Sequence, residues 1–415
     1  MRPSRAGRAC LCRRRRSAGH HATVLLLDLT HTSHTQARTG IQKVCRSLFG
    51  TLATAVDVQP ICHDPYRSAW RTLEPGERQT LASASPSQRR GAHWPLATRL
   101  RGRLTRMVGA VAPPLPQATG LIVPEIFSPA TAGALPGLLQ AVGGARVALF
   151  HDAIALKYPE LSPSGTVARF PGYLQELLAF DGIAAVSEDS RDALLEYWRW
   201  LGVKATPPVQ AIPLGIDDHP IDFTAPAEKR DAPPVVLCVG TLEARKNHLA
   251  LLEACESLWT AGLTFELHLI GMAQTQTGQH ALERIRALQA AGRSLRYDGP
   301  VSDPALHAAY RRAAFSVYPS IMEGFGLPVL ESLRYGRPCI CSGQGALGES
   351  ARGGGCLPLD RVASGDLAQA IRRLLTTPAD REALVRACHA RRFKTWSQYG
   401  AEILSWMTTL DRRPE

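Results

Sequence analysis

The sequence contains no apolar segment long enough to cross a bilayer as a helix. Such a helix needs about 20 consecutive, mostly apolar residues, and the apolar run from Thr23 to Leu27 is far shorter. The Arg-rich start of the chain is not followed by the apolar region and small-residue cleavage site of a secretory signal. We therefore expect a chain that does not span a membrane and that resides in the cytoplasm.

Sequence patterns that bind metal ions are also missing. Close cysteine pairs occur at Cys10 and Cys12 and at Cys339 and Cys341, and neither pair has the two-residue gap of a zinc or thioredoxin motif. The chain has no Asp-X-Asp signature. We expect neither a bound divalent metal ion nor a cofactor.

Positive charge is unevenly distributed along the chain. The formal net charge of +12 comes more from Arg than from Lys and is concentrated at Arg2–Arg16 and Arg89–Arg106. Because no helix-turn-helix, RNA-recognition or zinc-finger pattern accompanies these runs, we do not expect a nucleic-acid partner. Each run is either a solvated tail or loop or a surface for an anionic partner. In the second case, Arg99–Arg106 would hold the protein on the anionic inner leaflet of the cytoplasmic membrane as a peripheral protein.

Short apolar runs typical of buried parallel strands recur along the chain. They alternate with stretches long enough for helices, which predicts an α/β fold with parallel sheets. The runs form two series, and a chain of 415 residues suits two domains. Between residues 63 and 119 the alternation weakens, and we expect irregular structure with one basic helix near Thr98–Val108. The expected strands are Thr23–Asp28, Gly120–Pro124, Arg146–Phe150 and Asp181–Val186, then Val235–Val239, Phe265–Ile270, Leu295–Tyr297, Phe315–Tyr318 and Pro338–Cys341.

One segment of the second series, Ser320–Pro338, has the pattern strand, loop, helix, strand. Pro328 suits the first turn of a helix, where its missing N–H would have no partner within the helix. Gly336 suits the left-handed position just past the helix end, and Pro338 prevents the helix from continuing. The pattern predicts a short helix that begins within the loop.

The same loop carries two glycines and two carboxylates. Gly324 and Gly326 allow backbone amides to approach a ligand closely. Glu323 in the loop and Glu331 on the helix can hold two sets of sugar hydroxyls, because a carboxylate accepts hydrogen bonds and donates none. The alternative is that Glu323 is an exposed loop residue and that Glu331 interacts with the helix dipole. The neighbouring glycines and proline favour the ligand site.

A second candidate site lies in the segment Cys238–His248. A strand ends near Gly240, and the following loop brings Arg245 and Lys246 to the start of a helix. Two cations at that position form a site for a diphosphate, which gains negative charge when a sugar bond breaks. The alternative is an ordinary solvated pair, and the spacing matches neither a Walker loop nor the dinucleotide fingerprint.

The first series supplies further candidates. Gly40 follows the first strand and precedes a helical pattern, so it can present backbone N–H groups to the same phosphates from across a cleft. His151 and Asp152 stand at the end of the strand that includes Val147–Phe150. Ligands of open α/β sheets bind at the carboxyl ends of strands, which makes this histidine a site candidate.

Together these segments resemble the glycosyl transferases group one, which are the retaining glycosyltransferases of family four. This family has the GT-B fold, in which two Rossmann-like domains with parallel sheets face each other across a cleft. The most specific segments are Val239–Asn247, Gly299–Leu306 and Glu323–Glu331. The segments His151–Glu160, Val186–Ser190 and Ile212–Asp217 resemble members that build bacterial surface polysaccharides, many of them mannosyltransferases.

The resemblance also implies the roles of individual residues. Glu323 would hold hydroxyls of the donor sugar, Glu331 the ribose, and Arg245 and Lys246 the diphosphate, while His151 would lie near the reacting sugar. The residues expected to act in catalysis are His151, Arg245, Lys246 and Glu323. Those expected to bind the donor are Gly40, Gly240, Thr241, Arg245, Lys246, Glu323, Gly324, Phe325, Gly326, Leu327 and Glu331.

By the same resemblance, the protein would transfer a hexose from a nucleotide sugar, with GDP-mannose as the first expectation. The acceptor would be a saccharide or lipid-linked glycan in the synthesis of a cell-envelope polysaccharide such as lipopolysaccharide. A nucleotide-sugar epimerase of similar two-lobed fold and a non-catalytic nucleotide-sugar-binding scaffold remain alternatives. The expected parts are a basic tail at 1–21, a first domain at 22–217, a linker at 218–231, a second domain at 232–392 and a C-terminal helix at 393–415 that crosses back to the first domain.

Overall fold

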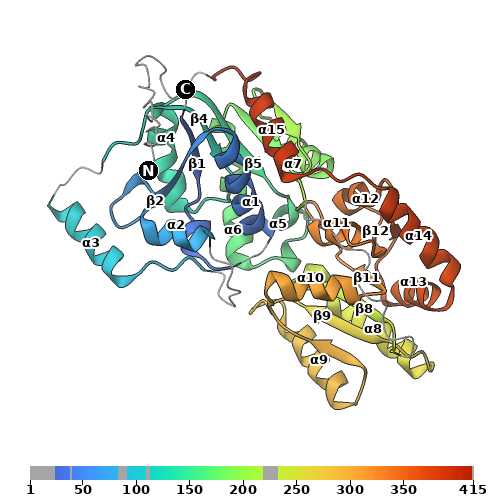
Figure 1. Ribbon diagram of the computed structural model, residues 1–415. Helices are drawn as coiled ribbons and strands as arrows, with labels where there is room; N and C mark the ends of the chain where they lie inside the picture. Colours follow the sequence, from blue (N-terminus) through green and yellow to red (C-terminus); the bar gives the residue numbers. More distant parts are fainter. Residues whose placement is uncertain (1–23, 38–39, 83–90, 109–112, 218–231, 414–415) are drawn as a thin grey trace, which may run out of the picture.

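The computed structural model describes residues 24–37, 40–82, 91–108, 113–217 and 232–413. The expected tail at 1–21 and linker at 218–231 lie outside these residues. The described chain forms two α/β lobes, each built around one sheet (Figure 1). The strands of the first lobe are coloured from blue to green in Figure 1, and the second lobe begins in yellow.

The first lobe contains a seven-stranded sheet with the order β3-β2-β1-β4-β5-β6-β7. Neighbouring strands are parallel except β2 and β3, which form an antiparallel pair at one edge. Four of the five residues of β1 are buried, as expected for a parallel strand covered on both faces. The strands are β1 Val24–Asp28, β2 Asp57–Asp64, β3 Ala69–Thr72, β4 Ala118–Val123, β5 Val142–Phe150, β6 Gly182–Ala185 and β7 Val209–Ala211.

The second lobe contains a six-stranded sheet with the order β10-β9-β8-β11-β12-β13. All of its neighbouring strands are parallel. In both lobes the carboxyl ends of parallel strands meet at one sheet edge, where loops can gather ligand-binding groups. The strands are β8 Val235–Val239, β9 Glu266–Ile270, β10 Leu295–Tyr297, β11 Phe315–Tyr318, β12 Cys339–Ser342 and β13 Cys356–Leu359.

Helices connect the strands and cover the sheets (Figure 1). Those of the first lobe are α1 Gly40–Ala55, α2 Pro75–Ala82, α3 Leu96–Met107, α4 Pro129–Ala141, α5 Ile154–Lys157, α6 Ser164–Glu176 and α7 Glu188–Trp200. Those after the linker are α8 His248–Thr260, α9 Gln279–Ala290, α10 Asp303–Arg312, α11 Leu327–Arg334, α12 Gly345–Ala351, α13 Ser364–Thr376, α14 Pro378–Ala390 and α15 Trp396–Met407. Short 3-10 turns are η1 Thr32–His34, η2 Pro159–Leu161, η3 Leu177–Ala179 and η4 Ala244–Lys246.

Helix α15 follows the second lobe in the sequence but packs against α1 of the first lobe (Figure 1). A capping box fixes its start, because Thr395 and Gln398 exchange hydrogen bonds there. After the helix, the backbone N–H of Arg413 donates to Asp181 Oδ1 at 2.8 Å. Asp181 also accepts from Arg146, whose Nη2 lies 2.7 Å from the same oxygen. The chain thus returns to the first lobe and completes a buried ion pair there.

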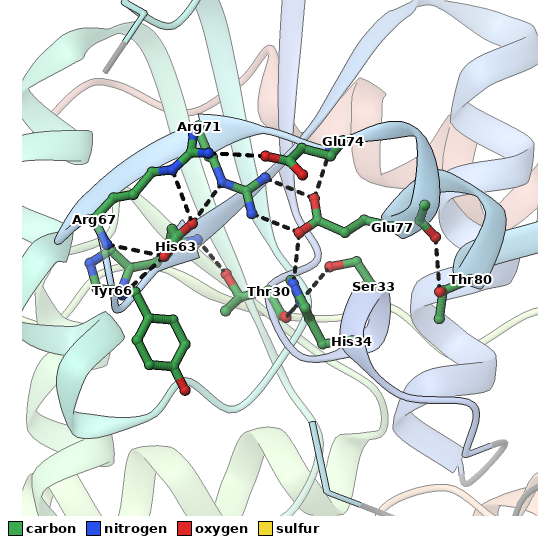
Figure 2. A network of polar contacts seen from close by, with 12 residues as sticks. Thr30, Ser33, His34, His63, Tyr66, Arg67, Arg71, Glu74, Glu77 and Thr80 are labelled. Atoms are coloured by element: carbon green, nitrogen blue, oxygen red, sulfur yellow. Dashed lines mark hydrogen bonds and ion pairs between the residues drawn. The ribbon is translucent and has the colours of Figure 1, made fainter. Parts of the chain in front are cut away.

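A buried polar network braces the β2–β3 edge of the first lobe (Figure 2). Arg71 donates to Glu77 through Nη1 and Nη2, at 2.8 and 2.6 Å, and to Asp64 through Nε at 3.0 Å. His34 Nε2 lies 2.8 Å from Glu77 Oε1, and its ring stacks on Trp94 with the centroids 3.5 Å apart. These contacts join η1, which follows β1, to the antiparallel edge and to α2.

The structure differs from the sequence expectation in two respects. Four strands were not expected, namely β2, β3, β7 and β13, and the stretch from 63 to 119 contains β3 and α2 as well as the expected basic helix, α3. The stretch was wrongly expected to be irregular because its order comes from the tertiary Arg71 network rather than from an apolar period. The expected bounds of the domains stay predictions.

Candidate active site

A cavity of about 690 Å³ lies between the two lobes. The first lobe contributes the start of α1 and the residues after β5, and the second lobe contributes the loops after β8, β9 and β11 together with α10 and α11. All residues expected to bind the donor or act in catalysis line this cavity. They are Gly40, His151, Gly240, Thr241, Arg245, Lys246, Glu323, Gly324, Phe325, Gly326, Leu327 and Glu331.

The centre of the cavity wall is a cluster of charged side chains around Glu323. Arg245 Nη1 lies 2.7 Å from Glu323 Oε2, and Lys246 Nζ lies 2.5 Å from Oε1. Arg245 also reaches Glu243 at 2.7 Å through Nη2. Lys246 donates to the hydroxyl of Tyr318 and lies 4.6 Å from the centre of that ring. The two cations expected at the diphosphate are therefore adjacent in space to the carboxylate expected at the sugar.

Burial and charge act on this cluster in opposite directions. Burial would raise the pKa of Glu323, but the charges of Arg245 and Lys246 outweigh it and lower this pKa from 4.5 to about 2. Burial lowers the pKa of Lys246 below its ordinary value, although Glu323 acts in the opposite direction. Glu323 is therefore ionised at neutral pH and can only accept hydrogen bonds from a ligand.

The loop that carries the two cations has an unusual backbone. Asn247, which joins η4 to α8, has φ of 56°, in the left-handed region. Asparagine tolerates this region better than most residues, and here its side-chain Nδ2 donates to Val362 O at 2.7 Å. Sequence reasoning did not single out Asn247. Its position directly after Arg245 and Lys246 was the available signal.

Glycine is required at the two positions of the loop before α11 for different structural reasons. Gly326 caps the helix with φ of 100°, a conformation that suits glycine. A Cβ on Gly324 would lie 2.0 Å from the carbonyl oxygen of His151, so this glycine permits direct contact between the lobes. The sequence assigned Gly324 to the approach of a ligand, whereas the structure gives it a packing role at the cavity wall.

His151 is buried and held in one orientation. Its Nε2 donates to Pro124 O at 2.7 Å, and because a carbonyl oxygen only accepts, this nitrogen carries a proton. Burial lowers the pKa of His151 below its ordinary value, which favours the neutral ring. The neutral form therefore keeps Nδ1 as an acceptor for a hydroxyl. The backbone oxygen of His151 accepts from Ser190 Oγ at 3.0 Å.

Glu331 is engaged by residues that sequence reasoning missed. Its Oε1 lies 2.6 Å from Lys43 Nζ, and its Oε2 accepts from Tyr310 OH at 3.0 Å. Lys43 belongs to α1 of the first lobe and also lies 3.0 Å from Asp217 Oδ2. No local pattern in the sequence marks these partners, since Lys43 and Glu331 are 288 residues apart.

The remaining expected residues complete the wall. Gly40 is the first residue of α1, and a Cβ there would meet no atom within 4 Å, so packing alone does not require glycine. Gly240 and Thr241 follow β8, and Phe325 and Leu327 flank the glycine that caps α11. Among the residues that the structure describes, no three His, Cys, Asp or Glu side chains group in a way that could hold a metal ion.

Comparison with known proteins finds similarity at the level of family and of fold. Residues 233–377 match the family model described as glycosyl transferases group 1. The chain is 27% identical over 352 residues to a serotype-specific mannosyltransferase WbdA from Escherichia coli, which covers 79% of this chain. The chain spans about 39% of the length of that relative.

Two solved structures share the fold over almost the whole chain. Sucrose-phosphate synthase from Thermosynechococcus elongatus matches with a TM-score of 0.64 and 19% identity, covering 93% of this chain and 98% of that one. HepE from Anabaena, solved with UDP and glucose, matches with a TM-score of 0.62 and 14% identity, covering 94% of this chain and 100% of that one. Among the described residues, no helix has the length and apolar character needed to cross a membrane.

Proposed function

We propose that the protein transfers a hexose from a nucleotide sugar to a saccharide or lipid-linked glycan, because residues 233–377 match the glycosyl transferases group 1 model and the chain has a GT-B fold. The donor is GDP-mannose, and the product is part of a cell-envelope polysaccharide such as lipopolysaccharide. The mannose assignment is supported by the similarity to a serotype-specific mannosyltransferase. The reaction takes place in the cytoplasm and needs no divalent metal ion.

The observation that carries the proposal is the Arg245–Lys246–Glu323 cluster on the cavity wall. In the proposed complex, Arg245 and Lys246 turn toward the diphosphate, and Glu323 accepts hydrogen bonds from the donor sugar. Glu331 accepts from the ribose, and the backbone amides at Phe325–Leu327 lie along the sugar and phosphates. The cluster lines a cavity of about 690 Å³, a size typical of small-molecule sites.

The proposed transfer retains the configuration at the anomeric carbon. The acceptor hydroxyl attacks this carbon on the face from which the diphosphate leaves, so the bond to the diphosphate oxygen breaks as the bond to the acceptor forms. The proton of the acceptor hydroxyl passes to the departing phosphate. Arg245 and Lys246 stabilise the charge on that phosphate, and the closed cleft keeps out water that would hydrolyse the donor.

Two alternative functions differ from the proposed transferase in the substrates that they consume. A nucleotide-sugar epimerase would convert the donor without an acceptor, and a binding scaffold would convert nothing. HepE of similar fold was solved with UDP and glucose, so a uridine nucleotide is the main rival to guanosine for the donor base. The proposed transferase consumes donor and acceptor together and releases one nucleoside diphosphate for each bond formed.

The first experiment is a thermal-shift panel of GDP, UDP, dTDP and ADP with their sugars, run on the wild type, Lys246→Ala and Lys394→Ala. A ligand that binds the native state raises the melting temperature. We expect a shift with one nucleotide that disappears in Lys246→Ala. Lys394 pairs with Glu402 outside the cavity, so Lys394→Ala should keep the shift. A silent panel with wild-type protein would contradict the donor-site assignment, and with it every function in which this cavity binds a nucleotide sugar.

We also propose that the first lobe contacts an anionic membrane through α3. This helix presents apolar side chains outward, because Leu96, Leu100, Leu104 and Met107 are 73, 59, 59 and 82% exposed. These residues are three or four positions apart, so they form one stripe along the helix. On the opposite side of the helix, Gly102 packs closely on Tyr66, and a Cβ at this position would lie 2.7 Å from Tyr66 Cβ.

Positive charge accompanies this stripe. Arg99 and Arg103 lie over the Tyr66 ring at 6.0 and 5.8 Å, and Arg101 and Arg106 are exposed. A helix with an outward apolar stripe and flanking arginines fits an anionic bilayer interface better than water.

The test is flotation with vesicles of phosphatidylglycerol and phosphatidylcholine at low salt. The double variant Leu100→Ser and Leu104→Ser should lose binding, whereas Leu249→Ser, an exposed apolar residue on α8, should keep it. Binding that survives both the serine changes and Arg101→Gln with Arg106→Gln would remove the membrane role from α3.

A further inference from the structure

Lys43 is the point at which three parts of the molecule meet across the cavity. It lies on the first turns of α1 in the first lobe, and its ammonium group is 2.6 Å from Glu331 on α11 of the second lobe. The same group is 3.0 Å from Asp217, which follows β7 and directly precedes the linker. A single side chain therefore joins both lobes and the last described residue before the linker.

The carboxylate of Glu331 is occupied on both oxygens in this arrangement. Lys43 holds Oε1, and Tyr310 OH donates to Oε2 at 3.0 Å. Burial would lower the pKa of Lys43, but Glu331 and Asp217 outweigh it and raise this pKa above its ordinary value. The ammonium group is therefore charged and firmly paired. Tyr310 lies within the same lobe as Glu331, so of the two bonds to Glu331 the Lys43 bond is the one that joins the lobes. The backbone N–H groups of Glu188 and Asp189 also donate across the lobes, to Glu349.

We propose that the Lys43–Glu331 ion pair is a latch between the lobes that the ribose of the bound nucleotide opens. This inference rests on the proposed function, in which Glu331 accepts hydrogen bonds from the ribose. Lys43 and the ribose hydroxyls require the same carboxylate from the same cavity. An ionised carboxylate has further acceptor sites, so the latch requires that the ribose displaces the ammonium group and breaks the contact between α1 and α11, rather than sharing the carboxylate with Lys43.

The latch predicts that removing a positive charge from the cavity increases the affinity for the nucleotide. If a fraction of the protein is latched, the apparent affinity for the nucleotide is reduced by that fraction. Removing the cation should then tighten nucleotide binding, even though a diphosphate is an anion. The ion pair is partly exposed, with side-chain exposures of 30 and 16%, so we expect a gain of about threefold to tenfold.

The experiment compares a nucleoside diphosphate with its 2′,3′-dideoxy analogue by calorimetric titration. The diphosphate is the one selected by the thermal-shift panel, and the proteins are the wild type, Lys43→Met, Lys43→Arg and Lys394→Met. Lys43→Met should bind the ribose-containing nucleotide about threefold to tenfold more tightly and the dideoxy analogue unchanged. Lys43→Arg retains a cation that can pair with Glu331, and both it and Lys394→Met should resemble the wild type.

Two results with a wild type that binds the nucleotide would overturn the latch. Equal weakening of both ligands in Lys43→Met would make Lys43 a diphosphate ligand instead, and unchanged affinity for both would make it a bystander. If no nucleoside diphosphate binds the wild type, the proposed function fails and the latch fails with it. If the wild type binds the nucleotide but Lys43→Met binds it no more tightly, the latch alone fails.

Discussion

Two buried clusters in this molecule have nearly the same chemistry and different surroundings. In the first lobe, Glu77 accepts from Arg71 and lies beside His34 (Figure 2). In the second lobe, Glu323 lies between Arg245 and Lys246. Burial alone would raise the pKa of each glutamate, but hydrogen bonds and positive charges from the neighbouring groups outweigh it and lower both pKa values to about 2.

The two clusters differ in whether a ligand in the cavity can reach them. Trp94 stacks on His34, Asp64 takes a further bond from Arg71, and neither Arg71 nor Glu77 lines the cavity between the lobes. The Glu323 cluster does line it. A buried Arg–Glu pair with a shifted pKa is thus not sufficient evidence of a functional site. The pair also needs a cavity through which a ligand can replace one of its partners.

The largest effect should come from opening the closed cluster. Arg71→Met leaves Glu77 and Asp64 buried without their main cation, and removing one partner of a buried ion pair is expected to reduce the free energy of unfolding by about 3–5 kcal/mol. Urea denaturation measures this loss. Nucleotide affinity of the folded variant should stay at the wild-type value. A loss below about 1 kcal/mol would contradict the bracing role of the network.

The matching change in the open cluster should act on turnover. In Lys246→Met, we expect kcat/KM to fall by about 10²–10³-fold, because the proposed function places this charge at the leaving group. The accompanying loss of stability should be smaller than in Arg71→Met, since Arg245 still pairs with Glu323. Steady-state release of the nucleoside diphosphate measures turnover. If the two variants lost the same stability and turnover were unchanged, both clusters would be structural.

Acid should weaken both clusters over the same range of pH. A glutamate whose pKa is lower in the folded than in the unfolded protein stabilises the fold fully above the unfolded value of 4.5, and this contribution disappears as the pH falls toward 2. Between these values the wild type should lose stability more steeply than Glu77→Gln or Glu323→Gln. Melting temperatures from pH 5 to pH 2.5 test this. Parallel curves for wild type and variants would rule out the low pKa values.

A smaller effect should come from the contact that brings the open cluster to the first lobe. A Cβ on Gly324 would lie 2.0 Å from His151 O, so Gly324→Ala forces the loop away from the first lobe. We expect this to destabilise the protein by about 1–3 kcal/mol and to lower kcat more than it raises the nucleotide Kd. Gly50→Ala on α1 is the control, because a Cβ there meets nothing within 4 Å and Gly50 does not line the cavity. Wild-type turnover in Gly324→Ala would show that the lobes need not touch at this point.

The sequence predicted the GT-B fold, and this is confirmed. The predicted family similarity is found over residues 233–377, and the class of enzyme is the proposal made above. The expected strands were found because buried parallel strands are continuous apolar runs. Strand β2 was missed because Asp57, Gln59 and Pro60 interrupt its pattern, and β7 is a three-residue edge strand. Short edge strands owe their structure to a neighbour rather than to their own sequence.

The residues of the candidate site also fall into those that a local motif marks and those that only the tertiary fold brings together. Arg245, Lys246 and Glu323 lie in local motifs, so their approach could be expected from short segments. Lys43 and Tyr310 reach Glu331 only through the arrangement of the two lobes, which no local pattern encodes. The roles of the site residues, the bounds of the domains and the independence from metal ions stay predictions.

The return of α15 to the first lobe also affects the order in which the protein can fold during synthesis. The Arg146–Asp181 pair is completed by the backbone of Arg413, and α1 is covered by α15. Both come after the whole second lobe in the chain. Domains usually fold in the order in which they leave the ribosome. Here the first lobe lacks part of its native packing until residues that follow the second lobe have been synthesised. The Arg146–Asp181 pair and the surface of α1 therefore gain their last contacts only after the second lobe has been synthesised.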